Sequence, residues 1–143
     1  GEAMDMMQAM NTGHDGSMTS CHANSPRDAF ARLETMVMMA SANIPDRVIR
    51  QMLSSAVNIV MHCARLNDGT RKITSIAEVR DVEDDQVILD DIFNLERTGV
   101  NQRGRITGRF KATGFKPRCM SRLKAYGIHL SPSIFQEEQV LKD

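Results

Sequence analysis

The spacing of apolar residues changes near residue 57, and this change restricts the folds that the chain can adopt. Between residues 26 and 56 apolar side chains recur every three or four positions, which is the period of an amphipathic helix. Residues 57–64 are almost continuously apolar, and apolar and polar residues alternate after them. These patterns are typical of a buried strand and of half-buried strands. Their order predicts an α/β fold with a mixed sheet and an antiparallel meander.

Three helices are predicted before this change. A short apolar helix covers residues 3–10. Ser25 and Pro26 are suited to the N-cap and first position of a second helix, and Pro45 opens a third. The stretch 17–23 is short enough for a buried strand, and residues 57–64 predict a central strand buried on both faces.

The rest of the chain is predicted to be a meander. Residues 67–70 read Asn-Asp-Gly-Thr, a hairpin-turn signal, and a second turn is expected at 83–85. Strands are expected at 73–79, 87–96 and 106–112, with a polar loop at 98–104. A small helix should follow Pro117 and end at Gly127. From Ser131 we expect a loose tail in which Ile134 and Phe135 could dock. We therefore divide the chain at residue 97 into a main part at 1–97 and a small C-terminal appendage and tail at 98–143.

Composition excludes several classes of protein. Eighteen basic and eighteen acidic residues cancel, so no overall field attracts nucleic acid or an anionic membrane. Three cysteines form no paired framework, which favours a reducing compartment. No apolar run is long enough to span a bilayer. We expect a cytoplasmic protein without direct membrane insertion and without a nucleic-acid partner.

Residues 12–24 concentrate the groups that carry chemistry. This stretch holds two histidines, two glycines and four hydroxyl side chains. The glycines that flank His14 and Asp15 suggest a tight turn or a close approach to a ligand, and we expect that ligand to be a phosphate. From spacing alone, hydrogen bonds at the ends of a strand explain His14 and His22 better than a phosphate does. That alternative stays open at this point.

A metal site or a cysteine nucleophile is not expected. Soft ligands occur at His14, Cys21, His22 and Cys63, but paired Cys-x-x-Cys spacing is absent. Neighbouring residues Cys21 and His22 would also point to opposite faces of a strand. We therefore predict no bound metal and a buried, non-catalytic Cys21 thiol.

Several segments together resemble a known superfamily. They are Glu2-Ala3, residues 8–17 (Gln-Ala-Met-Asn-Thr-Gly-His-Asp-Gly-Ser), 22–29 (His-Ala-Asn-Ser-Pro-Arg-Asp-Ala), 32–34, 71–79 and 91–93. They resemble the secretion ATPase superfamily of type II and type IV systems, and within it the ATPases of tight-adherence (Flp) pilus assembly. The resemblance extends to about Phe135. It implies the C-terminal part of a RecA-like P-loop NTPase core.

The resemblance also implies roles for single residues. His14 and His22 match the two box histidines that face the terminal phosphate, with Thr12 and Gly13 as the turn into the first. Ser20 stands where the family usually has threonine, so the hydroxyl is kept.

Three charged residues complete the predicted site. Glu2 resembles the glutamate that closes the segment after the Walker B region, and we place it with the catalytic group. Arg27 and Arg32 are candidates for contact with the nucleotide or a neighbouring subunit, although a solvated helix face would also explain them.

For the parent protein, the resemblance implies ATP and magnesium, a hexamer, and an inner-membrane platform protein that holds it at the membrane. The sequence contains no Gly-x-x-x-x-Gly-Lys-[Ser/Thr] motif. It also enters a helical pattern at once, without an initiator methionine, so we expect a C-terminal fragment that neither binds ATP tightly nor hydrolyses it alone. The alternative is a non-catalytic interaction module that kept the scaffold of the motor.

Overall fold

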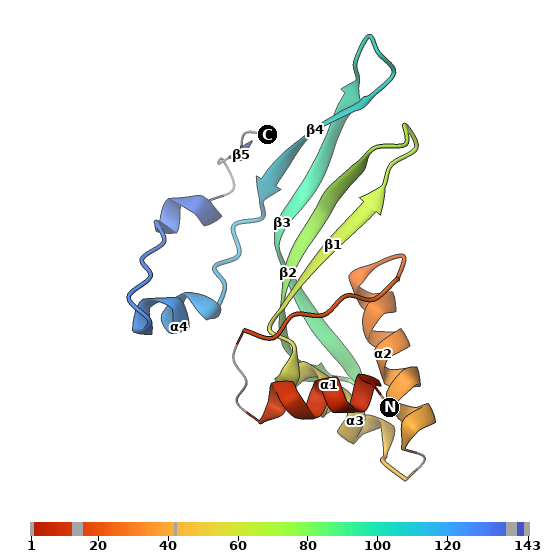
Figure 1. The fold of residues 1–143 in the computed structure, drawn as a ribbon. Helices are drawn as coiled ribbons and strands as arrows, with labels where there is room; N and C mark the ends of the chain where they lie inside the picture. The colour runs from red at the N-terminus through yellow and green to blue at the C-terminus, as the bar shows by residue number, and fades with distance from the viewer. Residues whose placement is uncertain (1, 13–15, 42, 137–139, 142–143) are drawn as a thin grey trace. The chain divides into compact units, whose positions relative to one another are not determined.

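The computed structural model describes residues 2–12, 16–41, 43–136 and 140–141 (Figure 1). Three helices come first: α1 (Glu2–Asn11), α2 (Pro26–Ala40) and α3 (Asp46–Ala56). Four strands follow: β1 (Ile59–Arg65), β2 (Arg71–Glu83), β3 (Gln86–Val100) and β4 (Ile106–Ala112). The chain then forms α4 (Cys119–Ala125), the 3-10 helix η1 (Pro132–Phe135) and the short strand β5 (Val140–Leu141).

The residues group into two compact units. The first comprises Gly1–Asn58 with Val79–Leu89, and the second comprises Ile59–Glu78 with Asp90–Asp143. The boundaries of these units differ from the predicted division at residue 97. That division refers to the domains of the parent protein, and it stays a prediction.

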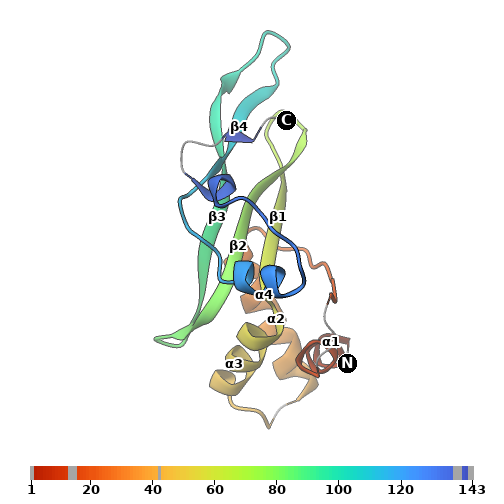
Figure 2. The same cartoon turned by 90° about the vertical axis from the view of Figure 1, so that its left-hand side faces the viewer.

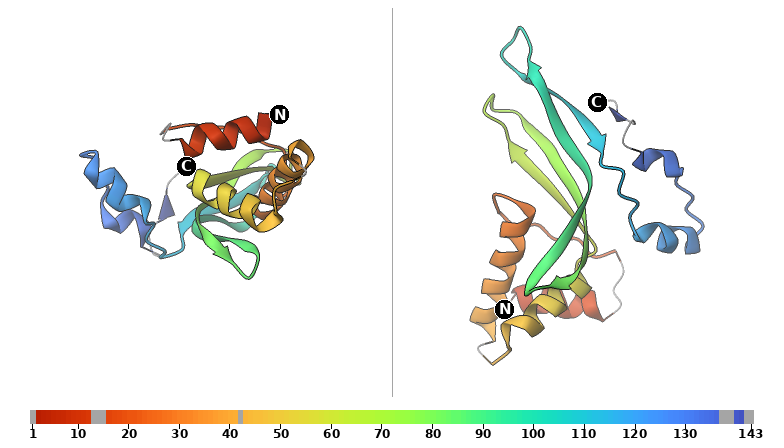
Figure 3. Two further views of the ribbon diagram at one scale, coloured as in Figure 1. Left: turned by 90° about the horizontal axis from the view of Figure 1, so that it is seen from below. Right: turned by 180° about the vertical axis from the view of Figure 1, so that it is seen from behind.

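The first unit has a helical core. The helices α1, α2 and α3 pack pairwise against one another, as seen from below in the left panel of Figure 3. Burying the apolar side of each helix supplies most of its stability. The largest fully buried side chains are Met7, Val37, Ile49 and Leu53.

Local signals place the start of α2 as predicted. The backbone N–H of Asp28 donates to Ser25 Oγ at 3.1 Å, and Pro26 occupies the first helical turn. Of the predicted apolar stripe of α2, Phe30, Leu33 and Val37 are buried. Met36 is 40% exposed, so the stripe is narrower than expected.

The strands form one sheet in the order β1-β2-β3-β4-β5, which confirms the predicted meander. The pairs β1–β2, β3–β4 and β4–β5 are antiparallel, and Figure 2 shows the twist of the strands. The predicted turn at 67–70 is present, and Asp84 and Asp85 form the turn after β2 with φ of 47° and 59°. Two such left-handed residues suit a tight hairpin turn. The mixed sheet is not seen in the described part of the chain.

Three predictions about strands are wrong. Residues 17–23 form no strand: they have no regular secondary structure, and residues 17–22 are exposed. The run 57–64 yields β1, which is an edge strand whose residues alternate between exposed and half-buried, not a central one. The sequence did not reveal the alternation between exposed and half-buried residues in β1, because Met61 and Cys63 on the exposed face are also apolar. Strand β3 continues to Val100, so the predicted loop shortens to 101–105.

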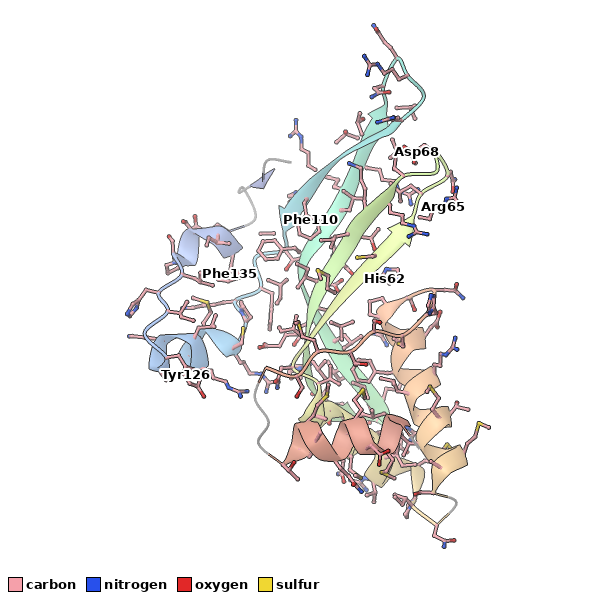
Figure 4. All side chains as sticks on the ribbon, viewed as in Figure 1. His62, Arg65, Asp68, Phe110, Tyr126 and Phe135 are labelled. Atoms are coloured by element: carbon pink, nitrogen blue, oxygen red, sulfur yellow. The ribbon has the colours of Figure 1, made fainter. Side chains whose placement is uncertain are left out.

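The second unit has an aromatic core. Phe93 stacks on Phe110 with ring centroids 5.6 Å apart and lies 5.9 Å from the Phe135 ring. Ile92 and Ala112 are buried in the same cluster. Figure 4 shows Phe110 and Phe135 directed toward one another from β4 and η1. The prediction of a loose tail from Ser131 is wrong for Pro132–Phe135, which form η1, because Phe135 is only 7% exposed and packs in this cluster.

Candidate functional site

The segment from Gly16 to Asn24 lacks regular secondary structure, and all of it except the half-buried Ala23 is exposed. Gly16 has φ of 85°, a conformation that glycine adopts at no steric cost. Ser20, Cys21 and His22 are all exposed. A polar stretch without ladder hydrogen bonds offers its donors and acceptors to a ligand or to water. Gly13 and His14 lie outside the described residues, so the placement of the first box histidine stays a prediction.

Helix α2 holds the downstream end of this segment. Arg32 Nη1 donates to the backbone carbonyl oxygen of His22 at 2.9 Å. The guanidinium thus holds the main chain at His22, while the imidazole remains exposed. This contact brings two predicted site residues together, with Arg32 touching the histidine backbone.

Helix α3 holds the upstream end, through contacts that sequence reasoning missed. Ser55 Oγ donates to Asn11 Oδ1 at 2.8 Å, and Asn11 Nδ2 donates to the Met52 carbonyl at 3.3 Å. Asn11 is the last residue of α1 and directly precedes the predicted Thr12-Gly13 turn. The partners are 44 residues apart, and no local pattern in the sequence signals such a pair.

Thr12, Ser20, Arg27 and Glu2 are the other predicted site residues. Thr12 Oγ1 donates to the Ala9 carbonyl at 3.1 Å and so finishes α1. Within the described part of the chain, no hydrogen bond or ion pair links Ser20 or Arg27 to His22. Glu2 begins α1, and its side chain lies outside the described residues. The roles assigned to all of these residues stay predictions.

The absence of a bound metal stays a prediction, because the candidate ligand His14 lies outside the described residues. They contain no group of three His, Cys, Asp or Glu side chains placed to hold a metal ion. The prediction that the Cys21 thiol is buried is wrong: Cys21 is exposed, because residues 17–23 do not form the buried strand that would have covered it. Cys63 is also exposed, whereas Cys119 is half-buried. The helices of the described ranges are all too short or too polar to cross a bilayer.

The sequence of this chain is similar to those of several known proteins. The chain is 40% identical over 73 residues to the type IV secretion system protein VirB11 of Brucella suis, covering 49% of this chain and 20% of that protein. It is 38% identical over 76 residues to the type IV secretion system protein PtlH of Bordetella pertussis, covering 50% of this chain and 22% of that protein. It is 31% identical over 71 residues to the conjugal transfer protein TrbB of Rhizobium radiobacter, covering 50% and 21%.

The matches thus span about a fifth of the length of these relatives. The family described as Type II/IV secretion system protein matches residues 1–115, which include the segment 12–24 and the strands β1 to β4. Because this match covers well over half of the chain, the chain belongs to the Type II/IV secretion system protein family.

Proposed function

We propose that this chain is the C-terminal part of the ATPase motor of a bacterial secretion or pilus-assembly machine. The complete protein carries a RecA-like core, forms a hexameric ring and couples ATP hydrolysis to transport. It works on the cytoplasmic side of the inner membrane, where a platform protein holds it. ATP and Mg²⁺ bind to the complete protein.

One observation carries this proposal: the exposed segment 16–24 is held by its main chain, and its side chains remain accessible. Arg32 fixes the carbonyl of His22, and the Asn11–Ser55 contact fixes the chain just before the turn. Catalysis of phosphoryl transfer depends mainly on donors held in place before the charge develops. A histidine with a fixed backbone and an exposed ring meets that requirement.

In this proposal His22 and His14 donate hydrogen bonds to the terminal phosphate of ATP. Mg²⁺, when bound, neutralises part of the phosphate charge. The neutral or protonated imidazole can donate to an anionic oxygen, and loss of that oxygen after hydrolysis would release the segment. Arg32 acts as a positioning residue, because it reaches the histidine backbone.

The test is His22→Ala in the full-length protein. The substitution removes the imidazole but keeps the carbonyl that Arg32 binds, so the segment should stay in place. We expect the turnover number for ATP hydrolysis to fall by roughly 100-fold, in the range seen for loss of one transition-state donor. The affinity for ATP should change only a few-fold, because most binding comes from elsewhere in the nucleotide site. Phosphate release and nucleotide titration measure the two quantities.

His129→Ala is the matched control. His129 is exposed and lies outside the residues that match the family. This variant should hydrolyse ATP like the unaltered protein. If His22→Ala also left turnover unchanged, the phosphate-sensing role would be refuted, and a non-catalytic interaction module would become the better account.

A further inference from the structure

Charges are segregated between the two units of this chain. The unit formed by Ile59–Glu78 and Asp90–Asp143 contains thirteen Lys and Arg against eight Asp and Glu. The unit formed by Gly1–Asn58 and Val79–Leu89 contains five against ten. Residues 97–136 include nine basic residues and no acidic one. The zero net charge of the chain therefore hides two opposite charges of similar size.

Positive charge gathers where two hairpin turns meet. Asp68 Oδ2 accepts the backbone N–H of Ile106 at 2.6 Å, which joins the β1–β2 turn to the start of β4. Asp68 Oδ1 also accepts from the hydroxyl of Thr70 at 2.7 Å. Figure 4 shows Asp68 and Arg65 at this end of the hairpin. The surrounding cations, which we call the basic tip, are Arg65, Arg71, Lys72, Arg97, Arg103 and Arg105.

The basic tip has unneutralised charge and a hollow that can take an acidic side chain. Within the described ranges none of its six cations makes an ion pair. A cavity of about 250 Å³ lies between Lys72 and Arg105 and is also lined by Thr70, Asn101 and Thr107. Cations and hydroxyl groups around one cavity are suited to a carboxylate.

Negative charge gathers at the turn after β2, which we call the acidic turn: Asp81, Glu83, Asp84 and Asp85. All four are exposed. Arg80 lies 3.6 Å from Glu83, and Arg50 lies 3.6 Å from Asp85. Two cations thus face four carboxylates, and the acidic turn keeps an excess of negative charge.

We propose that the basic tip of one copy of this protein docks on the acidic turn of a second copy. Arg71 and Lys72 begin β2 and Glu83 ends it, so every copy carries both surfaces. Every copy supplies both partners in equal measure, and the charges of the two surfaces are complementary. A contact between two different surfaces of identical copies is head-to-tail, which closes into a ring when the rotation allows.

This inference rests on the ring assembly proposed above and names the surfaces that meet in it. One exposed ion pair contributes little, so the contact depends on several pairs acting together. It should therefore weaken as salt screens the charges.

Charge reversal in the full-length protein tests the contact. The tip variant carries Arg103→Glu and Arg105→Glu, and the turn variant carries Asp81→Lys and Glu83→Lys. Asp84 and Asp85 are left unchanged because their positive φ would strain a lysine. In the tip variant four cations and two glutamates leave a charge of +2 in place of +6, and in the turn variant two lysines and two aspartates leave 0 in place of −4. Each variant therefore has one weakened surface and one unaltered surface. We expect self-association, measured by sedimentation velocity in about 0.1 M salt, to weaken at least 10-fold.

Two further samples decide the matter. An equimolar mixture of the tip and turn variants should form dimers, because the unaltered basic tip of the turn variant meets the unaltered acidic turn of the tip variant. A single chain with all four substitutions has neither surface unaltered and should stay dissociated. The control Lys116→Glu with Lys124→Glu makes the same charge change on exposed residues outside the tip and should associate normally.

Failure would be unambiguous. Either variant alone assembling like the unaltered protein would overturn the contact, and so would a mixture that stays dissociated. A different outcome is that the tip variant loses binding to anionic vesicles or nucleic acid while it self-associates normally. That result would assign the basic tip to those ligands and would also overturn the contact between copies. Sedimentation is measured without ATP, so it does not depend on ATP hydrolysis. If the unaltered protein assembled normally but did not hydrolyse ATP, the result would contradict the proposed ATPase function and leave the proposed contact standing.

Discussion

Glu78 is a buried carboxylate, with 4% of the residue exposed, and it binds the start of α4. Its two oxygens accept the backbone N–H groups of Arg118 at 2.8 Å and Cys119 at 2.9 Å. Burial, and then the Glu78 charge, raise the pKa of the Cys119 thiol. The carboxylate thus holds the helix start and keeps the neighbouring thiol protonated.

Replacing Glu78 with Ala should destabilise this junction. Two backbone donors would lose a charged acceptor, and we expect the free energy of unfolding to fall by roughly 2–3 kcal/mol. Cys119 should also react faster with a maleimide, because the thiol becomes more accessible and its pKa falls. Urea denaturation and peptide mapping of labelled cysteines measure the two effects.

The exposed residue Glu96 provides the control, since Glu96→Ala should change neither quantity. Glu78→Gln should lie between the two, because its amide oxygen can accept only part of what the carboxylate accepts. Unchanged labelling of Cys119 in Glu78→Ala would show that other contacts hold α4.

At the scale of elements, Asp68 links two hairpins that are far apart in sequence. The hydroxyl of Thr70, followed by the backbone N–H groups of Ile106 and Thr70, lowers the pKa of Asp68 below its usual value. A carboxyl whose folded pKa lies below its unfolded pKa stabilises the fold fully above the unfolded pKa. That contribution is lost as the pH falls through the folded pKa.

We therefore expect the link to be constant from pH 8 to pH 5 and to weaken only below about pH 4. The amide resonance of Ile106, followed by NMR, should move in that acid range. Asp68→Asn keeps an acceptor but cannot titrate, so its Ile106 resonance should stay constant with pH. A transition of the Ile106 amide between pH 5 and 7 would contradict the assignment.

At the scale of the whole molecule, opposite charges of similar size sum to zero, and the isoelectric point is about 7.1. Molecules without net charge repel one another weakly. The chain also exposes large apolar side chains, including Met18 at 96% and Met39 at 84%. Charge attraction and apolar contact would both promote association, but salt affects them in opposite directions.

We expect the solubility of the chain to be lowest near pH 7 and to rise when salt increases from about 0.05 to 0.3 M, because screening weakens attraction between opposite charges. Static light scattering at pH 5.5, 7 and 8.5 measures this. Bovine serum albumin, measured in parallel, controls for buffer effects. Scattering that increases with salt would instead attribute association to the exposed methionines.

Elements with local signals were predictable. Ser25 and Pro26 define the start of α2 because the cap hydrogen bond and the fixed φ of proline need only adjacent residues. The Asn-Asp-Gly-Thr turn and the alternation after it predict the β1–β2 hairpin for the same reason. In the candidate site, His22 and Arg32 were both identified, although the contact between them was not.

What the sequence by itself determined is the set of helices, turns and meander strands, since their signals are short-range. Only the tertiary structure decided that residues 17–22 are exposed, that β1 is an edge strand, and that Glu78 is buried. It also decided the contacts of Asn11 with Ser55 and of Asp68 with Ile106. These features depend on which segments of the chain contact one another. Burial and pairing between residues distant in the sequence cannot be predicted from the spacing of apolar and polar residues within one segment.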